Sequence, residues 1–246
     1  MNHPEKAPGT ALITGAARRI GRALALDLSR AGWTIAIHYR KSAPAAQMLV
    51  GEIESKGGRA QAFQANLIDP EAPRALVADV ARVFGSPTVL INNASEFLPD
   101  TVQNLDNETW DLHLGINLKA PVFLAQAIAA GLPEGCEGNI INIIDQRVWN
   151  LTPDFFSYTI SKAGLWTATR TLAQALAPRV RVNAIGPGPV LRSIHQTDDD
   201  FERESRSTLL RRGASTDEIA AAVRFILATP SLTGQMIALD GGQHLT

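Results

Sequence analysis

The sequence predicts an α/β fold, a doubly wound parallel sheet of about seven strands with helices on both faces. Short apolar runs alternate with amphipathic stretches along the whole chain, which is the pattern of repeated β-α units. Several apolar runs contain almost no polar residue, as expected of strands that helices cover on both sides. Because we find no repeat or linker-like break, we expect residues 1–246 to form a single domain.

The apolar runs predict the strands, and the amphipathic stretches between them predict the helices. The expected strands are Thr10–Thr14, Thr34–Tyr39, Ala60–Ala65, Thr88–Asn92, Asn139–Ile144, Arg181–Ile185 and Gln235–Leu239. The expected helices are Arg19–Ala31, Ala43–Lys56, Pro70–Phe84, Asp106–Ala130, Phe156–Ala177 and Thr216–Ala228. Two polar segments fall outside this alternation: we expect residues 1–9 to form a loose N-terminal tail and residues 187–215 a loop that acts as a lid over a site.

Composition excludes several classes of function. The net charge is 23 − 24 = −1, which disfavours nucleic acid or a membrane surface as a partner. Cys136 is the single cysteine, so an internal disulfide is excluded and a reducing compartment fits. The sequence has no apolar run of about 18 residues and no secretory signal, so we expect a cytoplasmic protein without a membrane span. Neither His113 nor His195 has partners at metal-ligand spacing, so we expect no metal site.

A glycine-containing turn links the first expected strand to the first expected helix. Such a turn presents backbone N–H groups and a helix N-terminus to a phosphate, as in the Rossmann dinucleotide-binding unit. An arginine, Arg19, stands where a middle glycine is usual, and it would either bind phosphate or substrate or lie in solvent at the start of the helix. The cofactor contacts expected in this turn are Gly15, Arg18, Arg19, Ile20 and Gly21.

The end of the second expected strand indicates which dinucleotide binds. A site that prefers NAD usually carries Asp or Glu here for the ribose hydroxyls, and this chain has neither. Basic side chains and a serine suit a 2′-phosphate instead, so we expect NADPH as the cofactor, although an ordinary basic turn would have the same composition. The residues concerned are His38, Tyr39, Arg40, Lys41 and Ser42.

Two residues on the fifth expected helix suit proton transfer. Tyr158 and Lys162 are four apart and share one helical face, and an ammonium beside a phenol lowers the pKa of that phenol. Asp145 ends the buried strand directly before this helix, which makes its carboxylate a third candidate. Pro121 cannot donate to the carbonyl of Asn117, so that carbonyl would be free to hold a water in a proton relay; a simple kink is the alternative.

The fourth expected strand ends in small residues that would let a cofactor approach the edge of the sheet. These are Asn93, Ala94 and Ser95, and asparagine amides at such a position can bridge neighbouring loops. Phe97 follows them and would either stack on a flat ligand or pack in the core.

Taken in order, these motifs resemble the short-chain dehydrogenase/reductase family over essentially the whole chain. The resemblance rests on Thr14-Gly15 with Gly21, Asn92-Asn93-Ala94, Asn117, Tyr158-x-x-x-Lys162, Asn183 and Pro187-Gly188. It implies that Tyr158 is the proton donor, that Lys162 binds the nicotinamide ribose and lowers the pKa of the tyrosine, and that Asn117 holds the water of the relay. It also implies a homotetramer.

Two departures from the family pattern resemble its pteridine reductase branch. Asp145 stands where the family usually has Ser, and Arg19 stands where it usually has Gly. The resemblance implies a pterin ring between Phe97 and the nicotinamide, with protons handled by Asp145 and Tyr158. The further contacts expected are Arg19, Ser95, Pro189 and Leu191 for substrate, and Asn66, Leu67, Asn93, Ala94, Ser95, Tyr158, Lys162, Pro187 and Gly188 for cofactor. Asn66 replaces an Asp that the family typically has against the adenine.

Three functions therefore stand as alternatives. The first is an NADPH-dependent reductase of a pterin such as dihydrobiopterin or dihydromonapterin, or of dihydrofolate. The second is a short-chain reductase of another small carbonyl or imine, and the third is a non-catalytic NADP-binding sensor. An ionised Asp145 would repel a developing alkoxide, which favours the first over the second. A sensor has no use for the proton-relay residues, which disfavours the third.

Overall fold

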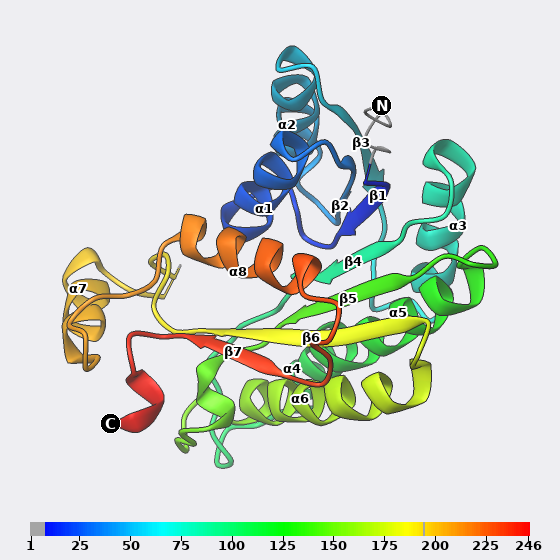
Figure 1. The fold of residues 1–246 in the computed structure, drawn as a ribbon. Coiled ribbons are helices and arrows are strands. Elements are labelled where there is room, and N and C mark those ends of the chain that lie inside the picture. Colours follow the sequence, from blue (N-terminus) through cyan, green and yellow to red (C-terminus); the bar gives the residue numbers. More distant parts are fainter. Residues whose placement is uncertain (1–7, 194) are drawn as a thin grey trace.

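The computed structural model describes residues 8–193 and 195–246 and contains a seven-stranded sheet in the order β3-β2-β1-β4-β5-β6-β7 (Figure 1). Every neighbouring pair of strands is parallel, so the predicted fold class is confirmed. Most of the predicted tail, residues 1–7, lies outside the described residues. The strands are β1 (Thr10–Ile13), β2 (Thr34–Tyr39), β3 (Arg59–Gln64), β4 (Val89–Asn92), β5 (Gly138–Ile143), β6 (Val180–Pro187) and β7 (Met236–Leu239).

Helices cover both faces of the sheet, and most follow the predicted ranges within a few residues. The long helices are α1 (Arg19–Arg30), α2 (Ala43–Ser55), α3 (Ala72–Phe84), α4 (Asn107–Leu114), α5 (Ala120–Gly131), α6 (Phe156–Leu176), α7 (Asp198–Ser207) and α8 (Thr216–Ala228). Short irregular turns are the π-helical η1 (Gly115–Lys119) and the 3₁₀ helices η2 (Gln146–Val148) and η3 (Gln243–Leu245).

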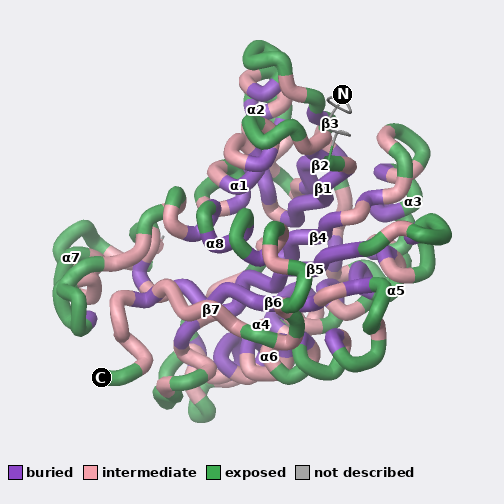
Figure 2. Tube along the Cα trace, in the orientation of Figure 1, coloured by how far each residue is buried: buried purple, intermediate pink, exposed green. Residues whose placement is uncertain are grey.

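Alternation along each strand divides the apolar side chains between two cores. In β1, Ala11 and Ile13 pack with α1, α2 and α8, whereas Leu12 packs with α3 and α5 on the other face. All four residues of β1 and β4 and all six of β5 are buried, which explains why these runs carry so few polar residues. Figure 2 shows the buried strands enclosed by helices whose outer faces are exposed.

The strand order reverses beside β1, because β2 lies on one side of it and β4 on the other. Chain segments leaving the carboxyl ends of β1 and β4 therefore turn to opposite faces and leave a crevice between them, where doubly wound sheets bind ligands. This topology brings the glycine turn after β1 and the Asn93 segment after β4 to one place.

The predicted helix over residues 106–130 is a continuous helical stretch with a π turn in its middle. In η1 the N–H of Ala120 bonds the carbonyl of Gly115, five residues earlier, so one extra residue is inserted into the helix. Asn117 lies inside this turn and Pro121 follows it. Such turns often occur at functional sites, because the inserted residue redirects a side chain.

The predicted lid, residues 187–215, contains a helix that the sequence reasoning missed. Helix α7 begins with a capping box in which the Thr197 hydroxyl accepts from the N–H of Asp200 and the Asp200 carboxylate accepts from the N–H of Thr197. Its three aspartates occupy the first turn, where they suit the positive end of the helix dipole. None of its residues is buried, so it lacks the apolar stripe by which the other helices are found.

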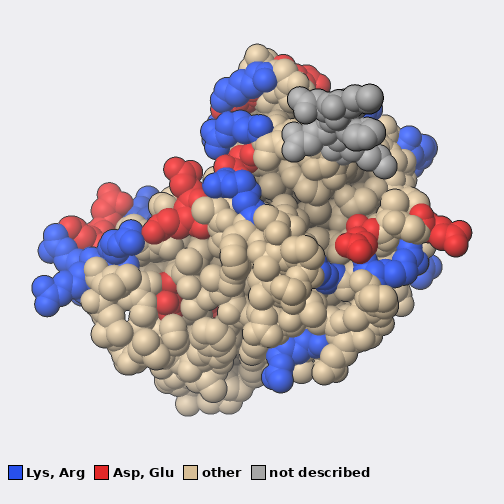
Figure 3. All heavy atoms as spheres, in the orientation of Figure 1, with Lys and Arg blue, Asp and Glu red and all other residues tan. Residues whose placement is uncertain are grey.

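One helical stretch of the described residues, Asn107–Gly131, is long and apolar enough to cross a membrane by length and composition alone. In its most apolar window the mean hydropathy is 1.3, and 44% of that window is buried inside the protein. Its two halves pack on α6 and on α3, so the core accounts for its apolar composition. On the face shown in Figure 3, positive and negative side chains are interspersed over α1, α2 and α7.

We predict that Thr169→Val lowers the free energy of unfolding by about 1–3 kcal/mol. The Thr169 hydroxyl is fully buried and accepts from the Asn142 amide at 2.8 Å, so the change leaves a buried donor of β5 without its partner. Urea unfolding measures the loss. Thr167→Val, on the exposed side of the same helix, should cost less than half as much, and equal losses would contradict this account.

Candidate active site

A cleft of about 670 Å³ opens at the carboxyl edge of the sheet, where the strand order reverses. Most of the predicted site residues line it, namely Gly15, Arg18, Arg19, Ile20, His38, Tyr39, Arg40, Lys41, Ser42, Leu67, Asn93, Ala94, Ser95, Phe97, Asp145, Tyr158, Lys162, Pro187, Gly188, Pro189 and Leu191. Three predicted residues do not contribute to its wall: Gly21, Asn66 and Asn117. One cleft thus joins the proposed cofactor and proton-transfer residues, which come from distant parts of the sequence.

The glycine turn is packed too tightly for side chains at two positions. A Cβ on Gly15, whose φ is +61°, would stand 3.0 Å from the Ala94 backbone. A Cβ on Gly21 would stand 2.6 Å from the carbonyl oxygen of Gly15. Asn93 fixes the turn from the neighbouring loop, since its amide donates to the carbonyls of Thr14 and Gly15 at 2.9 and 3.2 Å. Gly21 therefore does not line the cleft, and its lack of a side chain lets helix α1 pack directly against the turn.

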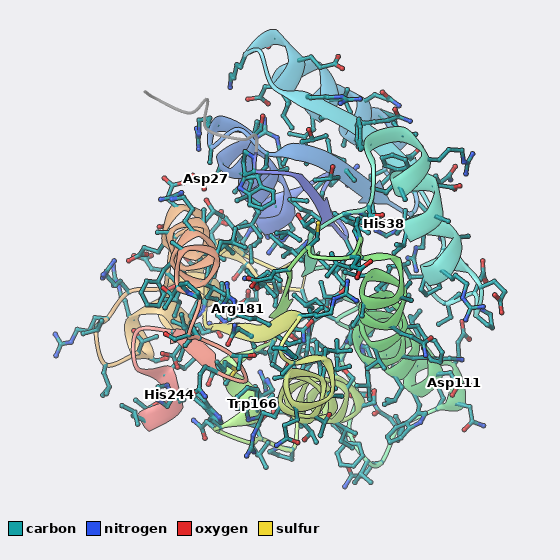
Figure 4. All side chains as sticks on the ribbon, turned by 45° about the vertical axis from the view of Figure 1, so that its right-hand side comes forward. Asp27, His38, Asp111, Trp166, Arg181 and His244 are labelled. Atoms are coloured by element: carbon teal, nitrogen blue, oxygen red, sulfur yellow. The ribbon has the colours of Figure 1, made fainter. Side chains whose placement is uncertain are left out.

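His38 supports the same turn from β2, pointing into the interior of the protein (Figure 4). Its Nδ1 accepts from the Gly15 N–H at 3.1 Å, which requires the proton of the neutral ring to be on Nε2, 3.2 Å from the Ala65 carbonyl. Burial lowers the pKa of His38 from 6.5 to about 4. The ring therefore acts as an uncharged brace beneath the turn, although part of it also reaches the cleft wall.

Basic side chains border the end of the cleft beside β2. Arg18 and Lys41 line it, and within the described residues neither forms an ion pair, whereas Arg40 is bound to Glu96 at 2.7 Å. Asn66 donates to Asp69, but its carboxamide oxygen is buried without a hydrogen-bond partner in the described part of the chain. Unpaired cations, an unpartnered acceptor and a turn with no room for side chains fit a phosphorylated dinucleotide.

Three predicted catalytic side chains meet on the opposite wall. The Tyr158 hydroxyl donates to the Asp145 carboxylate at 2.8 Å, and the other carboxylate oxygen accepts from the N–H of Arg147 at 2.8 Å. Lys162 donates to the Ile143 carbonyl at 3.0 Å, and its Nζ lies 5.7 Å from the centre of the Tyr158 ring. The side chains of Tyr158 and Lys162 are almost completely buried.

The electrostatics of this wall correct one expectation. We predicted that Lys162 would lower the pKa of Tyr158, but burial and the charge of Asp145 raise that pKa well above its usual value. Burial also raises the pKa of Asp145, against the opposing hydrogen bonds from Arg147 and Tyr158. Burial lowers the pKa of Lys162 to about 8, although the Asp145 charge acts in the other direction. The tyrosine therefore keeps its proton.

Asn117 lies behind the cleft wall and holds the loop after β4. Its side-chain oxygen accepts from the Glu96 N–H at 2.9 Å and the Ser95 hydroxyl at 3.1 Å. Its amide donates to the Glu96 carbonyl and to the Ser161 hydroxyl, both at 3.0 Å. The side chain thus ties Ser95 and Glu96 to helix α6, and the predicted water on its main-chain carbonyl stays a prediction.

Phe97 belongs to an aromatic cluster on the cleft wall. Its ring is stacked on Phe155 with centroids 4.2 Å apart and meets the edge of Tyr158 at 4.7 Å. His195, from the segment after β6, is not stacked on Phe97, but its Nε2 lies 3.1 Å from the Phe97 carbonyl oxygen. Aromatic rings therefore line the cleft next to the Tyr158 ring.

Arg19 connects the glycine turn to the predicted lid. Its backbone is left-handed, with φ of 54°, a conformation that a glycine would adopt without strain. Its guanidinium donates to the carbonyls of Arg192 and Leu191 at 2.7 and 2.9 Å. In this arrangement the side chain holds the segment that leads to α7.

Several cleft residues were not predicted from the sequence. They include Phe155, Gln146, Arg147, His195, Gln196, Phe201, Glu204 and Gln243. Gln146 and Gln243 each keep a buried carboxamide oxygen that has no partner among the described residues, so both offer an acceptor to a ligand. The Thr-x-x-Asp capping pattern at residues 197–200 was the one local signal, because it marks the helix that carries Phe201 and Glu204.

Comparison with known proteins assigns the chain to a protein family. A family model described as enoyl-(acyl carrier protein) reductase matches residues 15–244. A protein from Cladobotryum sp named short-chain dehydrogenase/reductase FrzI is 32% identical over 246 residues, covering 94% of each chain. The chain belongs to the short-chain dehydrogenase/reductase family. It is an NADPH-dependent oxidoreductase.

Within this family, the relatives of the chain carry names that indicate different activities. The 3-oxoacyl-[acyl-carrier-protein] reductase FabG of Staphylococcus aureus (strain Mu50) is 33% identical, over 96% of this chain and 98% of the relative. FolM alternative dihydrofolate reductase 1 from Brucella suis, solved with NADP, is 48% identical with a TM-score of 0.95, over 98% of this chain and 96% of that one. A blue fluorescent protein from a metagenomic library, solved with NADPH, is 32% identical, with a TM-score of 0.88 over 96% and 98%.

We predict that acid weakens the fold through His38. Between pH 6.5 and about 4 the unfolded chain binds a proton on this ring and the folded chain does not, so stability falls as the pH falls, by about 3 kcal/mol over that window. Urea unfolding of the parent, His38→Gln and the exposed control His195→Gln measures the difference. NMR titration of the His38 ring should give a midpoint near pH 4, and a midpoint near 6.5 would contradict the claim that a neutral, buried His38 supports the glycine turn.

We predict that Arg18→Ala and Lys41→Ala each weaken NADPH binding by about tenfold and leave NADH binding unchanged. The reason is that only NADPH carries the 2′-phosphate that these cations would neutralise. Calorimetric titration with both cofactors measures the affinities. Lys56→Ala, which removes a cation at the far end of α2, serves as control, and an equal loss of NADPH and NADH affinity would contradict the assignment.

Proposed function

We propose that this protein reduces a dihydropterin, or dihydrofolate, with NADPH. The observation that carries the proposal is the 2.8 Å hydrogen bond from the Tyr158 hydroxyl to the Asp145 carboxylate, beside the aromatic wall formed by Phe97. A phenol and a carboxyl group, coupled to each other next to a flat apolar surface, suit a flat ring whose nitrogen must receive a proton.

The chemistry requires two transfers. Reduction of a ring C=N bond takes a hydride onto the carbon and a proton onto the nitrogen, and bound NADPH supplies the hydride. Tyr158 and Asp145 supply the proton. Because burial raises the pKa of Asp145, this carboxyl is protonated more readily than an exposed one, and it can give the proton directly or restore it to Tyr158.

Lys162 and Asn117 have supporting roles in this proposal. Lys162 would bind the nicotinamide ribose, and its position 5.7 Å from the Tyr158 ring centre keeps a cation near the phenol when the proton leaves. Asn117 holds Ser95 and Glu96 in place, and its main-chain carbonyl holds a water of the relay. Ser95 and Arg19 would contact the substrate ring and the cofactor phosphates.

The similarity to the Brucella suis protein supports a pterin or folate substrate. That protein is named an alternative dihydrofolate reductase, and it matches this chain at 48% identity over nearly its whole length. The Brucella canis protein of the same name matches at the same identity, with a TM-score of 0.92.

A second candidate is the reduction of another small carbonyl or imine. It is favoured by the relatives named 3-oxoacyl-[acyl-carrier-protein] reductase, at 33% identity. An ionised Asp145 would weigh against ketone reduction, since a negative charge 2.8 Å from the Tyr158 hydroxyl would repel the developing alkoxide.

The proposal includes a cytoplasmic homotetramer and a lid. Trp149, Leu151 and Leu245 expose large apolar side chains, which supports packing against a further copy of the chain. Residues 187–215 would close over the substrate as the lid of a single domain spanning residues 1–246, with Pro189 and Leu191 against the ring.

We predict that Asp145→Ser abolishes reduction of dihydropterins and leaves NADPH affinity within about twofold of the parent, and that Tyr158→Phe lowers every turnover by about 10²–10⁴. NADPH oxidation is followed against dihydrobiopterin, dihydromonapterin, dihydrofolate and a set of ketones and quinones.

Asp154→Ser is the matched control, because it removes an exposed carboxylate close to the same helix. Parental pterin turnover in Asp145→Ser would remove the proton role of Asp145. Turnover of ketones alone by the parent would favour the second candidate, and turnover unaffected by Tyr158→Phe would exclude the proposed mechanism.

A further inference from the structure

Three buried polar side chains next to the active site have no part in the chemistry described so far. They are Asp100, from the loop after β4, His113, from α4, and Ser157, from the first turn of α6. His113 and Ser157 are fully buried and Asp100 is 4% exposed. Burying polar groups of this kind is costly unless each is hydrogen-bonded, so their arrangement carries information.

The hydrogen bonds among these side chains have a defined direction. The Leu98 N–H donates to Nε2 of His113 at 3.0 Å, so the neutral ring carries its proton on Nδ1. That proton is donated to the Ser157 hydroxyl at 2.6 Å, and the hydroxyl in turn donates to the Asp100 carboxylate. Burial lowers the pKa of His113 in spite of the charges of Asp100 and Glu96, which agrees with a neutral ring.

The chain of hydrogen bonds begins and ends on the loop that carries Phe97. Leu98, one residue after Phe97, is held by His113, and Asp100 is held by Ser157. On the other side of Phe97, Glu96 is held by Asn117. The backbone is therefore fixed on both sides of the aromatic ring.

The same hydrogen-bond network also caps the start of α6. Phe155 precedes the helix in a left-handed conformation and provides no side-chain cap. Asp100 replaces that cap, since its carboxylate accepts from the Ser157 N–H at 3.2 Å and its carbonyl accepts from the Phe156 N–H at 3.2 Å. Tyr158 follows immediately, and the ring of His113 lies edge to face with it at 5.9 Å.

We propose that His113, Ser157 and Asp100 form a positioning network that sets the place of Phe97 relative to Tyr158 and thereby the affinity of the cleft for a flat ring. The inference rests on the proposed function, in which the substrate ring lies on Phe97. The network touches neither cofactor nor substrate. It acts through the edge-to-face contact between Phe97 and Tyr158, whose ring centroids are 4.7 Å apart. The network holds the backbone on both sides of this contact, in the loop that carries Phe97 and at the start of α6 before Tyr158.

The decisive variant is Ser157→Ala, which removes one hydroxyl and separates His113 from Asp100 while the backbone cap of α6 remains. We expect the KM for the dihydropterin to rise about tenfold, with kcat and the NADPH dissociation constant changed by less than about twofold. His113→Leu should give the same pattern, and His113→Gln should restore most of the affinity, because the carboxamide oxygen can replace the acceptor nitrogen of the neutral ring and the NH2 group can replace its donor.

Thr169→Val is the matched control, since it deletes another buried hydroxyl of α6 that bonds a neighbouring element. It should lower stability and leave KM at the parental value. A parental KM in Ser157→Ala, or equal KM changes in Ser157→Ala and Thr169→Val, would overturn the network. If His113→Leu does not fold, Ser157→Ala decides alone, as the milder change.

Failure of this inference is separable from failure of the proposed function. A parent protein that reduces neither a dihydropterin nor dihydrofolate refutes the proposed function, and the same variants are then compared on whichever substrate of the panel it reduces. A parent that reduces dihydropterins, together with Ser157→Ala at parental KM, refutes the network alone.

Discussion

The common direction of the seven strands is the constraint on which the rest of the structure depends. Because every strand is parallel to its neighbours, every carboxyl end reaches the same edge of the sheet. The reversal of order beside β1 then sends the chain that follows β1 and the chain that follows β4 to opposite faces of the sheet, and the cleft opens at the edge where they part. Gly15, Asp145 and Gly188 are far apart in the sequence but line the same cleft, because the strand order brings the segments that carry them together.

Much of this arrangement could be predicted from the sequence, and the parts that could not share a physical reason. Strands buried on both faces are recognised by unbroken apolar composition, and the glycine turn and Tyr158–Lys162 pair are local patterns. Helix α7 was missed because it buries no residue and so has no apolar period. The π turn at Asn117 was missed because it changes hydrogen bonding and not composition. Phe155, Glu204 and Gln243 were missed because only the fold brings them to the cleft.

The pKa of Tyr158 illustrates why a local motif is insufficient for electrostatics. Spacing along a helix correctly places a cation near the phenol, but it says nothing about the depth of the site or about a carboxylate arriving from another strand. In the fold, burial and Asp145 dominate, and both favour the protonated phenol. Burial, together with the residue that distinguishes this site from the usual family pattern, therefore reverses the direction of the expected pKa shift.

The cap that Asp100 provides for α6 has an electrostatic consequence. Aligned peptide dipoles give the start of a helix a positive charge of about half an elementary unit, and α6 is 21 residues long. Tyr158 lies in its first turn, so this field alone would favour a phenolate. The carboxylate of Asp100 is located at the same helix end and offsets the field. With that field offset, burial and Asp145 keep the proton on Tyr158, which is the state that a reduction consumes and an oxidation would have to produce.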